Sequence, residues 1–440
     1  CKLTNPINTS GMIVRFTYLV FAAAFLIAPL GVSQTVDDAI ALALRHNPQL
    51  DISAAETDAA RAQKIDAVGQ FLPSVSATVS ASQENWRSDE LERLRKEDGV
   101  TYSLAFSQPI FQGGTAYFGF KEANASTKAQ LLLERENRQL VAEAAAIAHA
   151  ALTLDREIVR HRTQSLDLLM QQVTFTDRRR EAGAESLIAV SQAKSRMQQE
   201  KAELVRAQAQ LAASEANYSR QTGEIPPAIL APDTKRMVDE IISAADGIAQ
   251  ALKLNPGLLA RDDLVAAARH GKRVARGQFA PKLSLDGQYT AYDLDESART
   301  PGLMQEPNEF QMVARLSIPI VQSGQNLSGL KSANARLARE DAARREARLL
   351  IEEAVTANWN QLQAADAAIE AAKAAVAASE IVVEGQQAEY SAGRTGIQDV
   401  LDGQRDLVFA RISLSQAEFD YRRAHYALLT LVDRLAPAEG

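Results

Sequence analysis

Cysteine is almost absent from this chain, and aromatic residues are scarce. The single cysteine, Cys1, among 440 residues excludes an intrachain disulfide and any cysteine-rich metal site. Aromatic residues make up only 5% of the chain, while alanine dominates the apolar fraction. This composition favours long, thin helical packing over a thick globular core.

The sequence also lacks a catalytic or cofactor-binding pattern. No histidine pair has the spacing of a metal site with a nearby glutamate, and Gly113-Gly114 is not followed by the Gly-Lys-Ser/Thr of a phosphate loop. The arginine runs at 178–180 and 344–345 are interpreted as solvated helix faces. We therefore expect no enzyme activity, no cofactor and no resident metal. The five scattered histidines are His46, His149, His161, His270 and His425.

The charge balance argues against nucleic acid as a partner. The formal net charge is −7, from 48 basic and 55 acidic residues. Residues 1–33 contribute only Lys2 and Arg15, which leaves 46 basic and 55 acidic residues, a balance of −9, in the rest of the chain. An acidic chain has no electrostatic basis for binding phosphate backbones.

Residues 1–33 are predicted to be an upstream extension and a secretory signal peptide. Residues 1–11 precede Met12, the apolar stretch covers residues 16–30, and small residues at Gly31 and Ser33 place the cleavage site before Gln34. A membrane anchor is the alternative, but about 15 apolar residues are short for a span. The sequence thus predicts export.

The stretch 325–435 is predicted to form a long antiparallel helical hairpin. It contains no proline, and Gly393 and Gly396 mark the turn between its arms. The first arm would be about 100 Å long at 1.5 Å per residue. Apolar residues recur at intervals of seven, which is typical of a coiled-coil seam. They are Val355, Leu362, Ile369, Val376 and Val383 on one arm, and Val400, Leu407, Leu414, Tyr421, Leu428 and Leu435 on the other.

The same hairpin occurs earlier in the chain, about 210 residues upstream. There Ala182-Gly183 corresponds to Ala392-Gly393, and Asn47-Pro48 corresponds to Asn255-Pro256. The earlier seam consists of Leu152, Val159, Leu166, Val173, Val190, Met197, Leu204, Leu211 and Tyr218. The chain is therefore predicted to be internally duplicated, with structural repeats at 35–225 and 238–435.

Each repeat is predicted to hold a leading helix and a pair of strands before its long hairpin. The leading helices are expected at 35–69, with a break at Asn47-Pro48, and at 238–277. Apolar and polar residues alternate over 74–82, 100–111, 283–289 and 310–318, which indicates strands with one apolar face. Polar loops are expected at 85–99 and 293–309.

Exported strands of this kind suggest an outer-membrane β-barrel. Four strands per chain cannot close a barrel, and open sheet edges are not viable in lipid, so several chains would have to pool their strands. Alternatives are a pair of periplasmic hairpins on a coiled coil, or a coiled-coil spacer.

Several short motifs occur in the same order in both halves of the chain, and in this order they resemble the TolC family of outer-membrane efflux and secretion channels. The resemblance covers about residues 35–435. The markers are the two Asn-Pro pairs, the proline-led strands at Pro73 and Pro281, Gln108-Pro109-Ile110-Phe111 with Gly113-Gly114, and Ala392-Gly393 ahead of Asp399-Val400-Leu401-Asp402. Only about five residues follow Leu435, a shorter tail than that of TolC itself, so any equatorial collar would be small.

The resemblance implies a mainly α-helical fold with a small β portion. Three chains would form an α-helical tunnel reaching into the periplasm and a 12-stranded outer-membrane barrel. The implied function is a passive exit duct of a tripartite efflux pump or type I secretion system. Its partners would be a periplasmic adaptor protein, an inner-membrane transporter and outer-membrane lipid. The alternative function is a periplasmic coiled-coil adaptor or scaffold.

The resemblance also implies a periplasmic gate near the second turn. Asp399 and Asp402 match the family's constriction residues and share one helix face, so a trimer would bring six carboxylates around one axis. Tyr390 matches the gate tyrosine, whereas Arg394 lies one position early for the gate arginine. Acidic residues at a helix start are otherwise ordinary. The turns Ala182-Gly183-Ala184 and Ala392-Gly393-Arg394 are expected to meet the adaptor.

Overall fold

The computed structural model describes residues 34–88, 93–231, 241–294, 308–320, 322 and 324–436; the predicted signal peptide lies outside these residues. Within them, a pair of short helices, a pair of strands and a long helical hairpin follow one another twice. The elements are α1 Val36–His46, α2 Pro48–Gly69, β1 Ser74–Ser88, β2 Arg93–Gln112, α3 Thr115–Glu181, α4 Leu187–Thr222, α5 Ala244–Leu254, α6 Pro256–Gly277, β3 Lys282–Leu294, β4 Asn308–Ser317, α7 Gln325–Ser391 and α8 Ile397–Leu431.

Both Asn-Pro pairs end one helix and begin the next. Neither Asn47 nor Asn255 has a helical backbone conformation, and each side chain accepts a hydrogen bond from the following helix, from Gln49 N and Leu258 N respectively, both at 3.0 Å. The break expected at Asn47-Pro48 is confirmed. The prediction of one helix over 238–277 is wrong, because residues 241–243 are not helical and Asn255-Pro256 divides the rest. Residues 238–240 lie outside the described residues.

The strands form one antiparallel sheet in the order β1-β2-β3-β4. Its two hairpins are longer than predicted. Strands β1 and β2 pair as far as Ser88 with Arg93, well into the loop expected at 85–99, and β3 reaches Leu294. The hydrogen bonds between strands are made by backbone groups, so the polar residues that suggested a loop did not end the pairing of β1 with β2. The sheet leaves β1 and β4 as open edges.

The sheet has one apolar and one polar face. Register places Tyr289 opposite Leu104 on β2 and Phe310 on β4, on the apolar face. On the polar face, Asp286 accepts hydrogen bonds from Ser107 at 2.7 Å and Ser284 at 3.0 Å and pairs with Arg315 at 3.3 Å. Large apolar side chains on the sheet are exposed in the single chain, including Phe310, Met312 and Leu316. The predicted alternation is confirmed.

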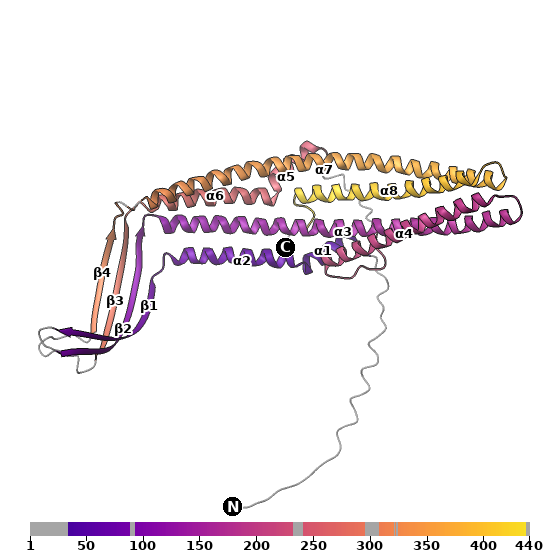
Figure 1. The fold of residues 1–440 in the computed structure, drawn as a ribbon. Coiled ribbons are helices and arrows are strands. Elements are labelled where there is room, and N and C mark those ends of the chain that lie inside the picture. Colours follow the sequence, from indigo (N-terminus) through magenta and orange to yellow (C-terminus); the bar gives the residue numbers. More distant parts are fainter. Residues whose placement is uncertain are drawn as a thin grey trace, which may run out of the picture.

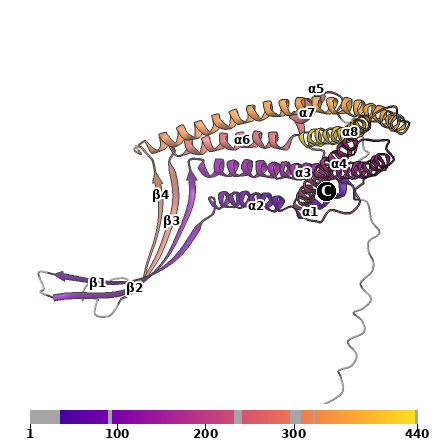
Figure 2. The same cartoon turned by 45° about the vertical axis from the view of Figure 1, so that its right-hand side comes forward.

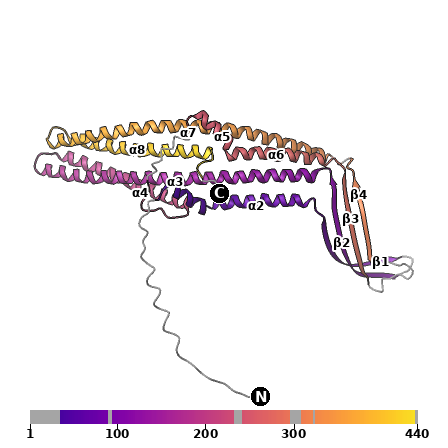
Figure 3. The same ribbon diagram turned by 180° about the vertical axis from the view of Figure 1, so that it is seen from behind.

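The helices form a long bundle with the sheet at one end, as opposite views show (Figures 1 and 3). Helices α2, α3, α6 and α7 lie side by side next to the sheet, while α4 and α8 fold back at the far end. The turned view in Figure 2 shows the strands bending away from the bundle. The α3–α4 and α7–α8 turns therefore lie together at the pole remote from the sheet.

Small side chains make up much of the core, as the composition predicts. Ala142, Ala145, Ala146 and Ala150 on α3 are at most 1% exposed. In the second hairpin six of the eleven predicted seam residues are buried, namely Val355, Leu362, Ile369, Val400, Leu407 and Leu428, and the other five are half-buried. Among the described residues, no helix combines the length and hydropathy needed to cross a bilayer.

Candidate gate between the tips of the helical hairpins

The two distant turns have nearly identical backbone geometry. Gly183 and Gly393 have φ of 76° and 73°, the left-handed region in which glycine ends helices. At each turn two hydrogen bonds close the helix. Gly393 N donates to Tyr390 O at 3.0 Å and Arg394 N to Glu389 O at 2.9 Å. The three residues of each predicted docking turn are exposed, so both turns present backbone to solvent, with Arg394 the one large side chain among the six residues.

Tyr390 lies at the contact between the two hairpins. It is 2% exposed and packs in a cluster with Leu169 on α3, Ala193 on α4 and Val400 on α8. Its hydroxyl lies 3.3 Å from both Thr176 Oγ1 and Glu185 Oε1. Burial raises the pKa of the Tyr390 phenol, which keeps the hydroxyl protonated as a donor.

These polar groups form a directional chain of hydrogen bonds. Tyr390 has a single hydroxyl proton and donates it to Glu185, so the Thr176 hydroxyl donates to Tyr390. Thr176 is fully buried and in turn accepts from Gln172 Nε2 at 3.4 Å. The chain joins α3, the first turn and α7, so separation of the hairpins would leave buried polar groups without partners.

Arg179 provides the positive charge at Tyr390. Its guanidinium lies 5.0 Å from the Tyr390 ring centre and 5.8 Å from that of Phe175. It also donates to the backbone oxygens of Tyr390 at 3.3 Å and Ser391 at 3.4 Å. The interpretation of 178–180 as a solvated face is therefore wrong for Arg179. It holds better for the neighbouring Arg180, which pairs with Asp177 on its own helix at 3.0 Å.

A second tie joins the hairpins at Asp402. Arg196 on α4 pairs with Asp402 Oδ1 at 3.0 Å, and Arg405 lies 3.4 Å from the same oxygen. Asp402 Oδ2 also accepts from Gln398 at 3.1 Å. Asp402 is therefore engaged by a residue of the other hairpin, which the sequence reasoning did not identify.

The other predicted gate residues are less connected. Asp399 is exposed and accepts a hydrogen bond from the Thr395 hydroxyl within the turn. Arg394 is exposed, and its side chain makes no hydrogen bond or ion pair with any described residue. The structure thus brings Tyr390 and Asp402 to the contact between hairpins, whereas Asp399 and Arg394 lie on the surface around it.

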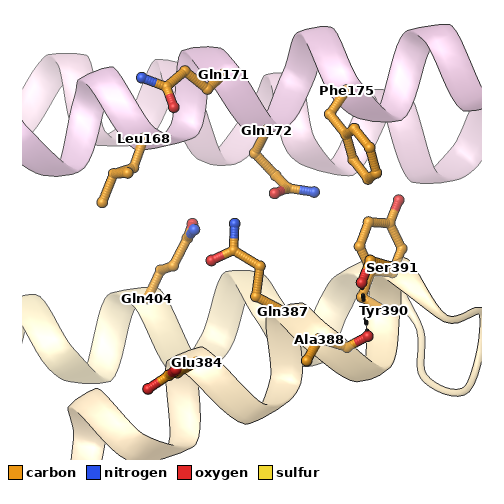
Figure 4. A pocket seen from close by; sticks show the side chains of 10 residues that line it. All are labelled: Leu168, Gln171, Gln172, Phe175, Glu384, Gln387, Ala388, Tyr390, Ser391 and Gln404. Atoms are coloured by element: carbon orange, nitrogen blue, oxygen red, sulfur yellow. Dashed lines mark hydrogen bonds between the residues drawn. The ribbon is translucent and has the colours of Figure 1, made fainter.

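A groove of about 490 Å³ runs beside this contact. Figure 4 shows Gln387 and Gln404 pointing from the second hairpin toward α3, with the Tyr390 ring close to Phe175. Four glutamines line the groove, which makes its wall polar without a fixed charge beyond Glu384. The lining residues are Leu168, Gln171, Gln172, Phe175, Glu384, Gln387, Ala388, Tyr390, Ser391 and Gln404.

A spacing in the sequence could have identified Thr176. Leu169 and Thr176 are seven residues apart and both buried, and they lie three residues after the seam positions Leu166 and Val173. They therefore form a second stripe of α3, turned toward the other hairpin. Arg179 and Arg180 follow Thr176 by three and four residues, so both lie near this stripe and the spacing alone does not tell which of them faces the other hairpin.

Comparisons with known proteins place this fold among outer-membrane channels. The family model described as outer membrane efflux protein matches residues 39–224 and 247–433. The outer membrane efflux protein BepC of Brucella suis biovar 1 (strain 1330) is 26% identical over 410 residues, covering 92% of this chain and 86% of the relative. The outer membrane protein TolC of Vibrio cholerae is 26% identical over 386 residues, covering 86% of each.

Solved structures share the fold at lower identity. A membrane protein from Pseudomonas aeruginosa superposes with a TM-score of 0.81 at 19% identity, covering 90% of this chain and 93% of that one. The outer membrane protein VceC of Vibrio cholerae superposes with a TM-score of 0.78 at 18% identity, covering 91% and 96%. These likenesses confirm the predicted fold class, with long helical hairpins and four strands per chain.

Proposed function

Because this chain belongs to the outer membrane efflux protein family, we propose that three copies form one channel whose periplasmic end is closed by contacts between the hairpins of each chain. The protein is an outer-membrane exit duct for efflux. The match to the channel family spans both halves of the chain, and it therefore does not favour the alternative function of a periplasmic adaptor. Beyond this function, we propose the trimer, the gate and the contact with periplasmic partners.

The open sheet edges support the trimer. Strands β1 and β4 each have one side without a strand partner, and the apolar face beside them is exposed. A sheet in lipid must close, because unpaired backbone groups have no water to bind. Three four-stranded sheets joined edge to edge would close into a barrel of 12 strands, with the bundle extending from it into the periplasm.

The contact of Tyr390 with the first hairpin carries the gate proposal. Arg179, Thr176 and Glu185 all bind one residue of the second hairpin, and Arg196 binds Asp402 nearby. Outward movement of the second hairpin would break both ties in each chain. We propose that Tyr390 stabilises the closed state of the gate. Arg394 lies at the rim of the gate, where it is free to contact a neighbouring chain or an adaptor.

Asp399 and Asp402 would line the constriction of the trimer as six carboxylates. Such a ring attracts cations and repels anions, and closely spaced carboxylate oxygens suit multivalent cations. Arg196 reduces the effective charge at Asp402 in the closed arrangement. Asp399 is therefore expected to contribute more to cation attraction while the hairpins remain together.

Planar-bilayer recordings test this ring. The double variant Asp399→Asn and Asp402→Asn should lose cation selectivity and block by multivalent cations, with trimer yield unchanged. The double variant Asp58→Asn and Asp66→Asn serves as the matched control, because it removes two exposed carboxylates of α2, at the other end of the bundle. If the double variant selects and blocks as the parent does, the aspartates do not form the constriction.

The two exposed turns are proposed to meet a periplasmic adaptor protein that connects the duct to an inner-membrane transporter. Both turns lie at the pole remote from the sheet and have the same backbone geometry (Figure 1). Ala182-Gly183-Ala184 and Ala392-Gly393 offer little side-chain bulk, so a partner can approach the backbone closely, and the exposed Arg394 adds a positive charge beside them.

A further inference from the structure

Positive charge is concentrated where the helices meet the sheet. The 22 residues from 264 to 285 contain five arginines and lysines and no carboxylate, in a chain whose net charge is −7. Most of these cations lie in the last turns of α6, immediately before β3. We name the cluster of Lys121, Arg269, Lys272, Arg273 and Arg276 the basic collar.

Three arginines of the basic collar share one exposed face. Arg269, Arg273 and Arg276 are spaced four and three residues apart, so they lie along one side of α6. All three are exposed, and none forms an ion pair with a described residue. Elsewhere on the bundle, arginines mostly pair with carboxylates, as Arg344 does with Asp262 at 3.3 Å. The exposed face of α6 thus keeps its full charge.

Aromatic rings from the start of α3 orient two cations of the basic collar. The Arg273 guanidinium lies 5.3 Å from the ring centre of Phe118, and Phe118 stacks on His270 with centroids 6.3 Å apart. Lys121 Nζ lies 5.7 Å from the ring centre of Tyr117. Cation–π contacts of this kind orient a cation without neutralising it.

The titration of His270 reflects the same surplus of charge. Burial lowers the pKa of His270, and the nearby charges of Arg273, Lys121 and Arg269 lower it further. The nearby carboxylate of Glu122 is already engaged by Arg336 at 3.1 Å. The basic collar therefore has room for an external anion.

The position of the basic collar identifies that anion. The sheet beside it exposes apolar side chains, and the exposed rings of Phe71, Tyr117 and Phe279 lie at its boundary with the helices. Aromatic rings and basic side chains are enriched where a membrane protein leaves the hydrocarbon region. We propose that the basic collar binds phosphate groups of phospholipids in the periplasm-facing leaflet, an inference that rests on the proposed location of the sheet in the membrane.

Native mass spectrometry of the mature full-length protein, titrated with phosphatidylglycerol or phosphatidylethanolamine, tests this proposal. Each basic residue near an anionic surface contributes about fivefold in affinity, so the triple variant Arg269→Gln, Arg273→Gln and Arg276→Gln should bind phosphatidylglycerol about 100-fold more weakly. Binding of phosphatidylethanolamine should change far less. The charge-retaining triple variant with lysine at these positions should keep the preference.

The matched control removes three positive charges far from the sheet, by Lys194→Gln, Lys201→Gln and Arg206→Gln on α4. These three residues are exposed, and the control should bind both lipids as the parent does. Equal loss in control and test variants would overturn the proposal, because charge anywhere would then suffice. Unchanged lipid binding with altered ion selectivity in bilayers would also overturn it, since the basic collar would then face the channel.

Failure of this inference is distinguishable from failure of the proposed function. Trimer yield and block by multivalent cations are measured on the same preparations. If the triple variant has the parent's trimer yield and the parent's block by multivalent cations, and its lipid preference is also unchanged, only the lipid proposal is refuted. If no trimer forms even in the parent, the location of the sheet is refuted first.

Discussion

Arg179 is the residue whose replacement should open the gate most directly. Arg179→Met removes the guanidinium from Tyr390 and Phe175 and from two backbone oxygens, but keeps an unbranched apolar side chain on α3. A cation–π contact is worth about 0.5–2 kcal/mol, and hydrogen bonds of 3.3 and 3.4 Å add little beyond that. We therefore expect a loss of about 2 kcal/mol per chain.

A loss of this size changes the balance of open and closed states by about 30-fold. If the three chains open together, the losses add to about 6 kcal/mol and the change exceeds about 10⁴-fold. Single-channel recording in planar bilayers gives the open probability directly. Arg179→Met should therefore be open at least about 30-fold more than the parent, and a much larger ratio would indicate concerted opening.

Arg180→Met is the matched control, because it removes the same charge one residue away. Arg180 pairs with Asp177 on its own helix and makes no hydrogen bond or ion pair with the described residues of the second hairpin. An exposed pair of this kind is worth a few tenths of a kcal/mol, so open probability should change less than about twofold. Equal open probabilities for the two variants would refute the assignment of Arg179 to the closed state, provided both give the parent's trimer yield.

Three further predictions concern other parts of the molecule. Ala392→Trp should impair transport and leave the trimer intact, because it places a bulky side chain on the docking turn. Replacing Gly393 instead would add backbone strain, since its φ is positive. Unchanged transport in Ala392→Trp would count against docking at this turn. Burial raises the pKa of Glu143, so the folded chain binds more protons than the unfolded chain above pH 4.5, and stability from this group falls as pH rises. Glu143→Gln should therefore raise the melting temperature by more at pH 7.5 than at pH 5, whereas an equal effect at both would contradict the shift. The mature chain should begin at Gln34, whose side chain accepts from Tyr218 at 2.7 Å, and N-terminal sequencing that found residues 16–30 retained would exclude this.

The heptads and the duplication predicted the helical hairpins because both are repeated patterns. A seam residue every seven positions defines a helix face without any knowledge of tertiary contacts. Ala182-Gly183 and Ala392-Gly393 located the turns to within a residue, since glycine at a positive φ is a local requirement. The errors were the ends of strands and the break at Asn255, where a local cap divides the helix predicted over 238–277 into α5 and α6.

The candidate gate was less accessible to sequence reasoning. Tyr390 was identified through resemblance, but its partners Thr176, Glu185 and Arg179 are about 205 to 214 residues away in the chain. Which of three consecutive arginines faces the other hairpin depends on how two hairpins pack, which one helix's periodicity does not contain. The tie from Arg196 to Asp402 is long-range in the same way.

The number of chains in the purified protein tests the account most directly. The account requires that the open edges of β1 and β4 be paired by neighbouring chains. Light scattering with the detergent contribution subtracted should give a mass of three chains, and the trimer should survive extraction from the outer membrane. A stable, folded monomer in detergent would contradict the account, because one four-stranded sheet cannot close a barrel.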